Sequence, residues 1–560
     1  MDTYRALLAV VISFVILVGY QYFFVGFDSK KAVKDPATQT SVSSVTTPPA
    51  LNQTGQATPP KQEALKQSLP PSVSSDHTIR EINVETDLYS AVITENSGAI
   101  KSFILKDYKA SLAKNSPGVQ LVKTTEQEGF PLTFSWGDVA AANTFYSSST
   151  DKVQFAGAET TSTLTMKGIT ESGLELERTY RFDRNTYLLE LVVRVKNGSA
   201  KPLQGSALLH QANLPFEEAA KGSTTSLFVG PAIFMDGQRQ EFKTKEITGE
   251  PKTVQGKVDW AAYDSTYFMC GILPENEGGT SVTMQQTDKL VTMQVGGALD
   301  ALQPGQEKIY KYRVYFGPKK LSLLQKTGYN LDKAVNFGWF DVMAKPTLWL
   351  LNFFHTYLKN YGIAIILVTV AFKLAFWPIA QKGLKSMKNM QKLQPKMAKI
   401  KEKYKDDPAM MNKEVMNLYK TYKVNPLGGC LPMVLQIPVF FALYKVLLMC
   451  IELRHAPFML WITDLSAPDR LMLGFDIPYL GGIPVLTLLM GASMFLQQKM
   501  TPSTADPTQA KIMMFLPIMF TFMFLNFASG LVLYWFINNL LAILQQYLIN
   551  KQVANKPLAA

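Results

Sequence analysis

The chain has 560 residues, of which 56 are basic and 44 acidic, giving a formal charge of +12, and 47% of its residues are hydrophobic. Charged residues make up only 18%, against about 25% in an ordinary soluble protein. This composition indicates a membrane protein with a polar part attached and excludes a disordered or collagen-like chain. Three widely spaced cysteines and four histidines without metal-ligand spacing argue against a disulfide framework and a metal site.

The first 78 residues are predicted to form a membrane anchor and a tether. The apolar run Ala6–Val25 is long enough, at ~1.5 Å per residue, to cross a ~30 Å hydrocarbon core. Its aromatic end, residues 20–24, lacks the small residues that a signal peptidase requires. We therefore predict an uncleaved signal anchor over residues 1–27, with a cleaved peptide as the alternative. Residues 28–78 are rich in Ser, Thr, Pro and Gln, which is typical of a disordered tether.

Residues 79–318 show the alternation of apolar and polar side chains that is typical of strands. Leu174, Leu176, Tyr180 and Phe182 alternate with polar residues, and turn signals such as Asn197-Gly198 separate the runs. The pattern predicts a large β-sandwich domain. Residues 319–360 are expected to connect it to the rest of the chain, and the interrupted apolar segment Val342–Leu358 is expected to form a helix lying in the outer membrane interface.

Residues 361–550 are predicted to form a core of five transmembrane helices, followed by a cytoplasmic tail at 551–560. The expected spans are Tyr361–Ala380, Leu431–Cys450, Ile483–Gln498, Ile512–Phe527 and Leu531–Ile549. Twelve lysines and four acids give the connection Gln381–Leu427 a net charge of +8, whereas Ile451–Gly482 has a net charge of −2. By the positive-inside rule the first connection is cytoplasmic, which places the β domain outside and Met1 in the cytoplasm. The fold class is thus a multi-domain α+β membrane protein.

The lysine-rich connection over residues 381–427 is predicted to be a helical hairpin. Its first helix is expected over Gln381–Tyr404, and Asp407 is expected to cap a second helix that begins at Pro408 and ends near Lys423. Methionines on one face suit the binding of apolar segments, so we expect contacts with such segments at this hairpin. The expected contact residues are Met387, Met397, Lys399 and Lys403. The alternative is a hairpin that packs on itself, with its lysines solvated near anionic lipid.

Lys373 is the candidate functional residue at membrane depth. It lies twelve residues after Tyr361, and Thr369 precedes it by one helical turn on the same face. An ionisable group at this depth usually faces a bundle interior or a wet cavity, and snorkelling to the headgroups is the alternative. Amide side chains on the other spans, including Gln436 and Asn538, either join that cavity or hold helices together. Since the spans contain no Asp or Glu, an ion-coupled transporter is disfavoured.

Several motifs in the last ~200 residues resemble the signature of the YidC/Oxa/Alb family of membrane insertases. They are Val424–Pro432 with Gln436–Tyr444, Leu393–Lys396, Ala456–Phe458 with Trp461-Ile462 and Asp464–Ser466, and Ser529–Tyr534. The anchor, tether and outer domain are similar to those of the Gram-negative form, and the outer domain resembles the galactose-mutarotase supersandwich. Lys373 stands where members usually have arginine, and Tyr534-Trp535 stands where they often have two tyrosines. Only His210 lies well inside the outer domain, so mutarotase chemistry is not expected.

The resemblance implies a protein that inserts and folds inner-membrane proteins, alone or with the Sec translocon, without enzymatic activity or a cofactor. It implies a hydrophilic groove that is open to the cytoplasm and to lipid but closed outward, with Lys373 at the position of the family's cation. The residues expected to line the groove here are Lys373, Thr369, Gln436, Tyr534, Trp535 and Asn538. The implied partners are nascent membrane proteins, the Sec translocon, the lipid bilayer and, through the hairpin and tail, the ribosome. The implied location is the bacterial inner membrane with the β domain in the periplasm. The alternative is a membrane transporter or a glycan-handling enzyme that uses the β domain.

Overall fold

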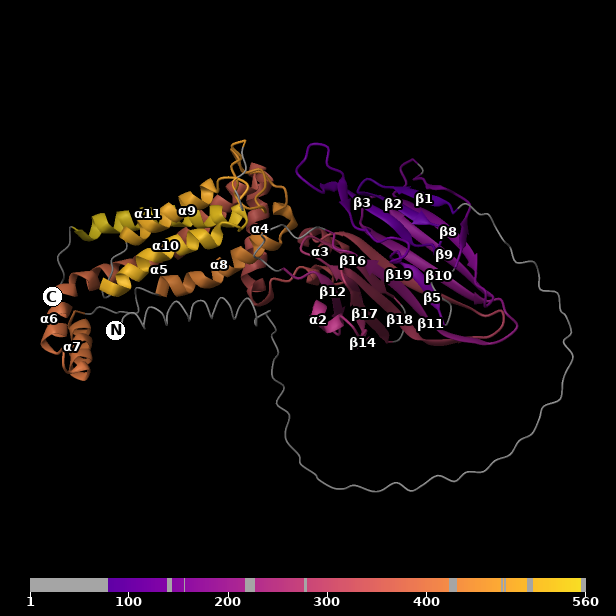
Figure 1. The fold of residues 1–560 in the computed structure, drawn as a ribbon, viewed down its shortest axis with the longest axis horizontal. Coiled ribbons are helices and arrows are strands. Elements are labelled where there is room, and N and C mark those ends of the chain that lie inside the picture. The colour runs from indigo at the N-terminus through magenta and orange to yellow at the C-terminus, as the bar shows by residue number, and fades with distance from the viewer. Residues whose placement is uncertain are drawn as a thin grey trace, which may run out of the picture. The chain divides into compact units, whose positions relative to one another are not determined.

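A computed structural model describes residues 79–137, 144–155, 157–216, 227–275, 279–422, 431–474, 477, 480–500 and 507–554. The predicted anchor and tether lie outside the described residues, as do the end of the tail and residues 423–430 of the predicted hairpin. The described chain consists of a β domain followed by a helical region (Figure 1).

The described strands of the β domain form three sheets. The nine-stranded sheet has the order β13 (Gln238–Glu241), β12 (Gly230–Met235), β15 (Val258–Asp264), β16 (Phe268–Pro274), β19 (Glu307–Pro318), β10 (Leu188–Asn197), β9 (Leu174–Asp183), β8 (Thr161–Ile169) and β6 (Tyr146–Ser148). One five-stranded sheet has the order β4 (Gly118–Gln120), β3 (Ile100–Lys109), β2 (Tyr89–Thr94), β1 (Glu81–Glu85) and β7 (Lys152–Val153). The other has the order β14 (Lys252–Gly256), β17 (Thr280–Thr287), β18 (Leu290–Leu302), β11 (Leu203–Asn213) and β5 (Thr133–Trp136).

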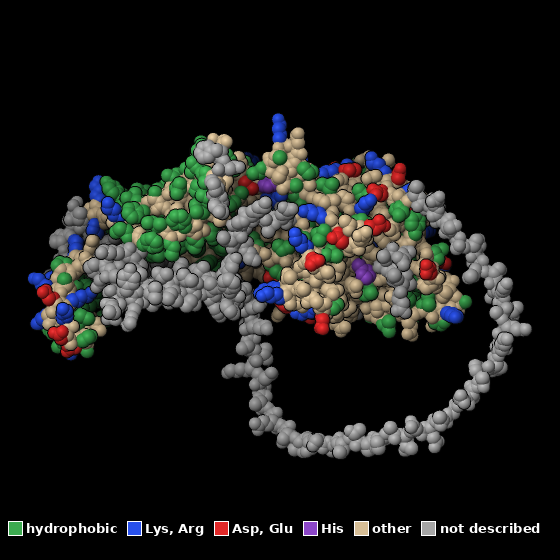
Figure 2. Space-filling model, viewed as in Figure 1, with side chains coloured by type: hydrophobic (Ala, Val, Ile, Leu, Met, Phe, Trp, Pro, Cys, Tyr) green, Lys and Arg blue, Asp and Glu red, His purple; other side chains and the backbone are tan. Residues whose placement is uncertain are grey.

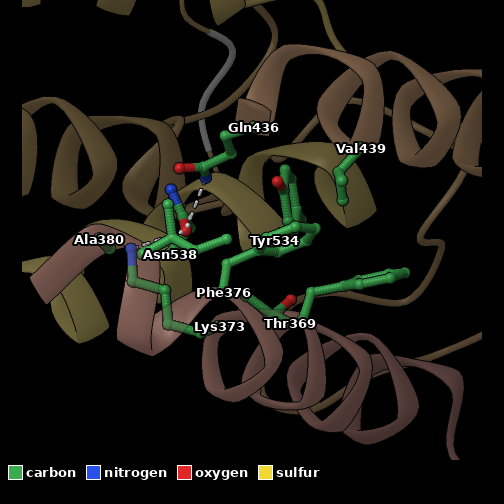
Figure 3. A pocket seen from close by; sticks show the side chains of 10 residues that line it. Thr369, Lys373, Phe376, Ala380, Gln436, Val439, Tyr534 and Asn538 are labelled. Atoms are coloured by element: carbon green, nitrogen blue, oxygen red, sulfur yellow. Dashed lines mark hydrogen bonds between the residues drawn. The ribbon is translucent and has the colours of Figure 1, made fainter. Parts of the chain in front are cut away.

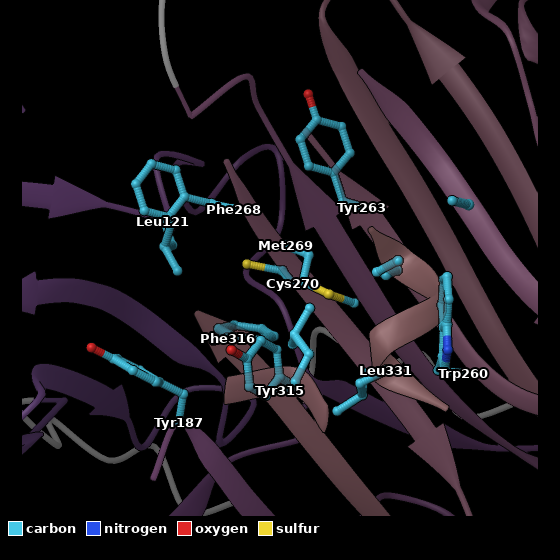
Figure 4. Packing of buried hydrophobic residues seen from close by; sticks show 14 of the residues in the cluster. Leu121, Tyr187, Trp260, Tyr263, Phe268, Met269, Cys270, Tyr315, Phe316 and Leu331 are labelled. Carbon is cyan, nitrogen blue, oxygen red and sulfur yellow. The ribbon is translucent and has the colours of Figure 1, made fainter. Parts of the chain in front are cut away.

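Both five-stranded sheets pack against the nine-stranded sheet through β19. The ring of Phe103 on β3 meets that of Phe316 at 5.5 Å, and the indole N–H of Trp136 on β5 donates to the hydroxyl of Tyr310 at 2.8 Å. Figure 4 shows how closely the buried side chains of β16 and β19 lie in this core, with Cys270 and Phe316 both fully buried. The alternation predicted for β9 is confirmed, because Leu174, Leu176, Tyr180 and Phe182 are all buried.

A buried arginine ties the three sheets together. Arg178 on β9 is fully buried, and its guanidinium donates to the carbonyl oxygens of Ser97 at 2.7 Å and Leu132 at 2.6 Å. It also donates to the hydroxyl of Tyr180 at 2.6 Å. Ser97 follows β2 and Leu132 precedes β5, so one side chain on the large sheet holds a connecting segment from each of the smaller sheets.

The β domain contains one short helix, α2 (Thr244–Ile247). Three short helices connect this domain to the helical region, which begins with α4 (Asp341–Leu358). They are α3 (Leu321–Thr327), η2 (Leu331–Ala334) and η3 (Gly338–Phe340). The helical region continues with α5 (Tyr361–Lys392), α6 (Gln394–Lys403), α7 (Pro408–Thr421), α8 (Leu431–Met449), η5 (Ile451–Leu453), α9 (Val485–Met500), α10 (Pro507–Phe524) and α11 (Ser529–Ala554). Helix α4 packs on α5 and α8, α11 packs on α5 and α9, and α9 packs on α10.

The surface of the helices is apolar where a bilayer would surround them. Figure 2 shows apolar side chains covering this part of the molecule, whereas charged side chains gather on the α6–α7 hairpin and on the β domain. Among the described residues, Tyr361–Lys392 and Ser529–Lys551 are long and apolar enough to cross a membrane, and Gln436–Met449 and Met513–Phe524 are shorter apolar helices.

Helix α5 runs past the predicted end of the first span at Ala380. It has 32 residues and ends at Lys392, so the helix predicted over Gln381–Tyr404 is divided between the end of α5 and α6, which begins at Gln394. Residues 381–392 contain no proline, and a single glycine, Gly383, costs a helix only about 1 kcal/mol, which does not end it. The break comes instead at Leu393, just before Gln394-Pro395, where the proline disfavours continuation of the preceding helix.

Candidate functional site

A small cavity lies between α5, α8 and α11 in the helical region (Figure 3). It has a volume of about 40 Å³, which is room for a few water molecules. Its lining combines the apolar side chains of Phe372, Phe376, Ile379, Ala380 and Val439 with the polar side chains of Thr369, Lys373, Gln436, Tyr534 and Asn538. Five of the six residues predicted to form a groove are therefore brought together by three helices far apart in the sequence.

Asn538 organises the polar side of the cavity. Its amide oxygen accepts a hydrogen bond from the ammonium of Lys373 at 3.4 Å and another from the amide nitrogen of Gln436 at 3.1 Å. These contacts join α11 to α5 and α8, and Figure 3 shows the three side chains converging. The ammonium of the half-buried Lys373 thus faces the cavity. The lining residues contain one cation and no carboxylate, so an anionic group could approach the ammonium without displacing a bound acid.

Thr369 lines the cavity, but its hydroxyl is already engaged. It lies one turn before Lys373, is buried, and donates to the carbonyl oxygen of Ile365 at 2.6 Å, within its own helix. A threonine that bonds back to the preceding turn can remain in an apolar helix without an unsatisfied donor. Thr369 therefore contributes polar surface and shape to the cavity, with its lone pairs as acceptors.

Trp535, the sixth residue predicted for the groove, is not among the residues that line this cavity. Tyr534 faces the cavity, whereas Trp535 is packed in an aromatic cluster, 4.9 Å from the ring of Phe440, 4.8 Å from Phe524 and 5.9 Å from Phe520. Consecutive residues on a helix point about 100° apart at ~3.6 residues per turn, so neighbours cannot both face one narrow cavity. The two residues belong to different environments even though they stand together in the motif.

Other amides on α11 hold helices together. Asn539 donates to the hydroxyl of Ser493 on α9 at 3.0 Å, and Gln546, seven residues later, donates to the carbonyl oxygen of Met500 at 2.5 Å. Gln545 donates to the carbonyl oxygen of Trp377 on α5 at 3.5 Å. Asn538 and Asn539 are adjacent, yet the first serves the cavity and the second serves helix packing.

The α6–α7 hairpin has contacts of its own, as in the alternative in which it packs on itself. Asp407 caps α7 as predicted, accepting from the backbone N–H groups of Ala409 at 3.1 Å and Met410 at 3.0 Å. The sulfur of Met397, one of the predicted contact residues, accepts from the hydroxyl of Tyr419 on the facing helix at 3.4 Å.

The remaining predicted hairpin residues differ in position. Met387 is half-buried on the extension of α5, whereas Lys399 and Lys403 on α6 are exposed. The exposed methionines of the hairpin are Met410 and Met416 on α7, which the sequence-based prediction did not name. They lie six residues apart on α7, a spacing that can be read from the sequence.

These features together define a helical membrane protein with a buried cation in its core and a large β domain. A family model described as the 60Kd inner membrane protein matches residues 353–556, and a model described as the YidC periplasmic domain matches residues 81–350. Membrane protein insertase YidC from Syntrophus aciditrophicus is 41% identical over 566 residues, covering 98% of this chain and 99% of that protein. YidC from Geotalea uraniireducens is 41% identical over 558 residues, with the same coverage.

The chain therefore belongs to the YidC family of bacterial inner-membrane proteins, whose members are membrane protein insertases with a periplasmic domain. The crystal structure of an active YidC insertase covers 84% of this chain and 93% of its own, at 18% identity and a TM-score of 0.35. A galactose mutarotase-like protein from Lactobacillus casei covers 42% of this chain and 100% of its own, at 14% identity and a TM-score of 0.32. At these TM-scores neither structure bears on function. The family is one of insertases and not of enzymes, so a transporter or a glycan-handling enzyme is not favoured.

Proposed function

We propose that this chain inserts nascent membrane proteins into the lipid bilayer through the cavity around Lys373. The observation that carries the proposal is an ammonium group on the wall of a cavity between apolar helices, held by the amide oxygen of Asn538 at 3.4 Å. Charged groups at such depth are costly to place and usually serve function. A buried cation without an acid among the lining residues suits a transient anionic guest.

The guest is the hydrophilic leader of a substrate. Acidic side chains on that leader are attracted to Lys373 more strongly than in bulk water, because the effective dielectric constant near the apolar helices is lower. The apolar segment that follows the leader passes along exposed apolar side chains into lipid. On α8 and α11 these include Ile437, Leu540, Leu544 and Leu548. Transfer of its apolar surface at ~25 cal/mol per Å² drives the step.

The proposal also covers the side of the membrane on which each segment lies and the molecules that the protein contacts. Residues 1–27 anchor the chain with Met1 in the cytoplasm, five further helices span the membrane, and the lysine-rich hairpin is cytoplasmic. The exposed Lys399 and Lys403 give this hairpin a basic surface for anionic lipid or for ribosomal RNA. Insertion proceeds alone or beside the Sec translocon, and the hairpin with the tail at 551–560 receives the emerging chain.

The test compares Lys373→Ala and Lys373→Arg in an assay that follows insertion of a single-span substrate with an acidic outer tail. We expect Lys373→Ala to lower the insertion rate at least fivefold and Lys373→Arg to retain most of it. A matched substrate with a neutral tail should respond less. Lys445→Ala is the control, because Lys445 is a half-buried lysine on α8 that does not line the cavity. Wild-type insertion by Lys373→Ala would show that the cation has no role.

A further inference from the structure

A second cavity lies between strands β12 and β13 and the segment that connects the β domain to α4. It has a volume of about 180 Å³, compared with about 40 Å³ for the cavity around Lys373. We call it the connector pocket. Its charged lining side chains are Arg239, Lys333, Lys345 and Asp341. Because three of these are cations and one is a carboxylate, the pocket favours an anionic ligand.

Direct contacts hold the connecting segment against the β domain. The indole N–H of the buried Trp260 on β15 donates to the carbonyl oxygen of Asn330 at 3.0 Å. The amide nitrogen of Asn330 donates to the carboxylate of Asp259 at 2.8 Å. The ring of Phe234, which lines the pocket, stacks on that of Trp260 at 5.9 Å. Lys333 follows Asn330 by only three residues, so these contacts also place its side chain at the pocket.

Arg239 is the most buried cation of the connector pocket, with 8% of its side chain exposed. Its Nη2 donates to the carboxylate of Asp264 at 2.6 Å, and its Nη1 pairs with Glu241. The buried Asp264 also binds the ammonium of Lys319 at 2.7 Å, so the guanidinium is firmly positioned. Its Nε–H, by contrast, is buried and has no hydrogen-bond partner among the described residues. Such a donor is costly to leave unpaired, and an anionic oxygen in the pocket would satisfy it.

The two lysines of the pocket have donors left for the same ligand. The ammonium of Lys333 contacts Asp332 at 3.2 Å, and that of Lys345 contacts Asp341 at 2.6 Å. An ammonium group has three N–H donors, so two remain on each lysine. With 45% and 31% of their side chains exposed, these are surface ion pairs, which contribute little to stability. A phosphate group has several acceptor oxygens and can therefore bind both lysines together with Arg239.

The pocket lies beside the most exposed apolar side chains of the connecting segment. Trp339 is 82% exposed and Val342 is 83% exposed, and both lie within residues 333–345, which supply one wall of the pocket. Trp349 and Phe353 continue the face of Val342 along α4 at helical spacing. Helix α4 runs across the direction of α5 and α8 (Figure 1). Because exposed aromatic faces of this kind lie at the headgroup level of a bilayer, the pocket is within reach of phosphate groups.

We propose that the connector pocket binds an anionic phosphate group at the outer membrane surface, supplied either by the headgroup of an anionic phospholipid or by a soluble phosphate. Arg239 donates from β13, and Lys333 and Lys345 donate from the connecting segment and α4. The bound phosphate therefore bridges the β domain and the start of α4. This binding goes beyond insertion: it uses the proposed outer position of the β domain and does not involve Lys373 or its cavity.

The first measurement detects the lipid source in the full-length chain. The protein is placed in nanodiscs of phosphatidylcholine that contain a photoactivatable phosphatidylglycerol, and crosslinked peptides are mapped by mass spectrometry. We expect crosslinks within residues 331–349 that saturate as the probe is increased. Unlabelled phosphatidylglycerol should displace them, whereas additional phosphatidylcholine, which has no net charge, should not.

The second measurement detects the soluble source. Inorganic phosphate is titrated into the same protein in nanodiscs of phosphatidylcholine alone, at constant ionic strength, and binding is followed by calorimetry. Saturable phosphate binding without lipid crosslinks would identify a soluble phosphate as the ligand. Crosslinks without phosphate binding would identify the phospholipid headgroup.

Charge-removing variants assign either signal to the connector pocket. The pair Lys333→Gln with Lys345→Gln should lower the crosslinking yield, or the affinity for phosphate, at least fivefold. Arg239→Lys, which keeps the charge but loses the Nε–H, should act in the same direction, and the lysine pair decides if this variant does not fold. The matched control is the pair Lys320→Gln with Lys326→Gln, because both lysines are exposed beside or on α3 and neither lines the pocket.

Signals in the Lys333 and Lys345 variant that equal those of the parent would overturn the inference. So would crosslinks confined to the α6–α7 hairpin without phosphate binding, since they would show only the general attraction of anionic lipid to a basic surface. Neither measurement reads insertion. A failure of the Lys373→Ala test therefore leaves this result standing, and a pocket that binds no phosphate leaves the proposed function standing.

Discussion

Lys373 on α5 and Asn538 on α11 are 165 residues apart in the sequence, yet the ammonium of the first donates to the amide oxygen of the second. The same oxygen accepts from Gln436 on α8, so one acceptor holds donors from two other helices. Asn538 is half-buried, and its removal would leave two donors without this partner at a cavity lined largely by apolar side chains. This relationship makes Asn538 the residue through which the cation is held in the cavity.

Substitution of Asn538 should change insertion according to the charge it introduces. Asn538→Asp places a carboxylate beside Lys373, which competes with acidic substrates, and we expect insertion of an acidic-tailed substrate to fall at least fivefold. Asn538→Leu removes the acceptor without adding charge, and insertion should fall for acidic and neutral tails alike. The measurement is a protease-protection assay of both substrates. Equal insertion of the two substrates by Asn538→Asp would contradict the competition.

The neighbouring asparagine serves as the structural comparison. The amide of Asn539 donates to the hydroxyl of Ser493 at 3.0 Å. Hydrogen bonds between membrane helices contribute about 0.6 kcal/mol on average and at most about 1.7 kcal/mol. A double-mutant cycle of Asn539→Ala and Ser493→Ala should therefore give a coupling energy in this range. The cycle is measured by reversible unfolding in detergent. The ratio of insertion rates for acidic and neutral tails should not change in these variants, and a changed ratio would place Asn539 in the substrate path.

Arg178 should be irreplaceable in the β domain. Its guanidinium makes three hydrogen bonds of 2.6–2.7 Å from a fully buried position, and a lysine cannot reproduce this geometry. Hydrogen bonds to a charged group contribute ~1.5–3 kcal/mol each, so both Arg178→Lys and Arg178→Met should destabilise the domain by more than about 3 kcal/mol. Chemical unfolding followed by tryptophan fluorescence measures the loss. Arg181→Lys, an exchange at an exposed β9 position, should cost little.

His210 should make the β domain sensitive to acid. Burial lowers the pKa of this imidazole, whose Nε2 atom lies 2.8 Å from the hydroxyl of Ser135. Because the pKa is lower in the folded state than in the unfolded state, the unfolded chain binds the proton first as the pH falls. Stability is therefore unaffected well above pH ~6.5 and decreases as the pH falls through and below that value. Hydrogen exchange of β11 at pH 7.5 and 5.5 tests this, and His210→Gln should show a smaller difference than wild type.

Sequence patterns predicted those features that depend on residues close together in the chain. The strands of the β domain followed from alternation, as in β9, and the capping of α7 by Asp407 followed from Asp-Pro at a helix start. Lys373 and Thr369 share the cavity because they are four residues apart on one helix. Gln436 and Asn538 were expected in the groove as polar residues at membrane depth, and Tyr534 was expected there through the family motif.

Features that depend on distant backbone groups were not predictable in this way. Asp469 and Arg470 counted in the sequence only as charges of the connection Ile451–Gly482. Their partners are the backbone N–H of Thr487 on α9 and the carbonyl oxygen of Leu525 just beyond α10, groups that every residue carries. Tyr534 and Trp535 could not be separated either. Only the rotation of α11 against α8 and α10 decides which ring faces the cavity.

The uninterrupted length of α5 has a mechanical consequence. Its 32 residues correspond to about 48 Å, well beyond a ~30 Å hydrocarbon core, so the helix that carries Lys373 also carries Lys388, which binds the side chain of Asn550 at 2.8 Å. One unbroken helix thus joins the contact of Asn360 with Phe458 to the contact of Lys388 with Asn550. Lys373 lies between these two contacts, so the position of the ammonium in the cavity depends on both.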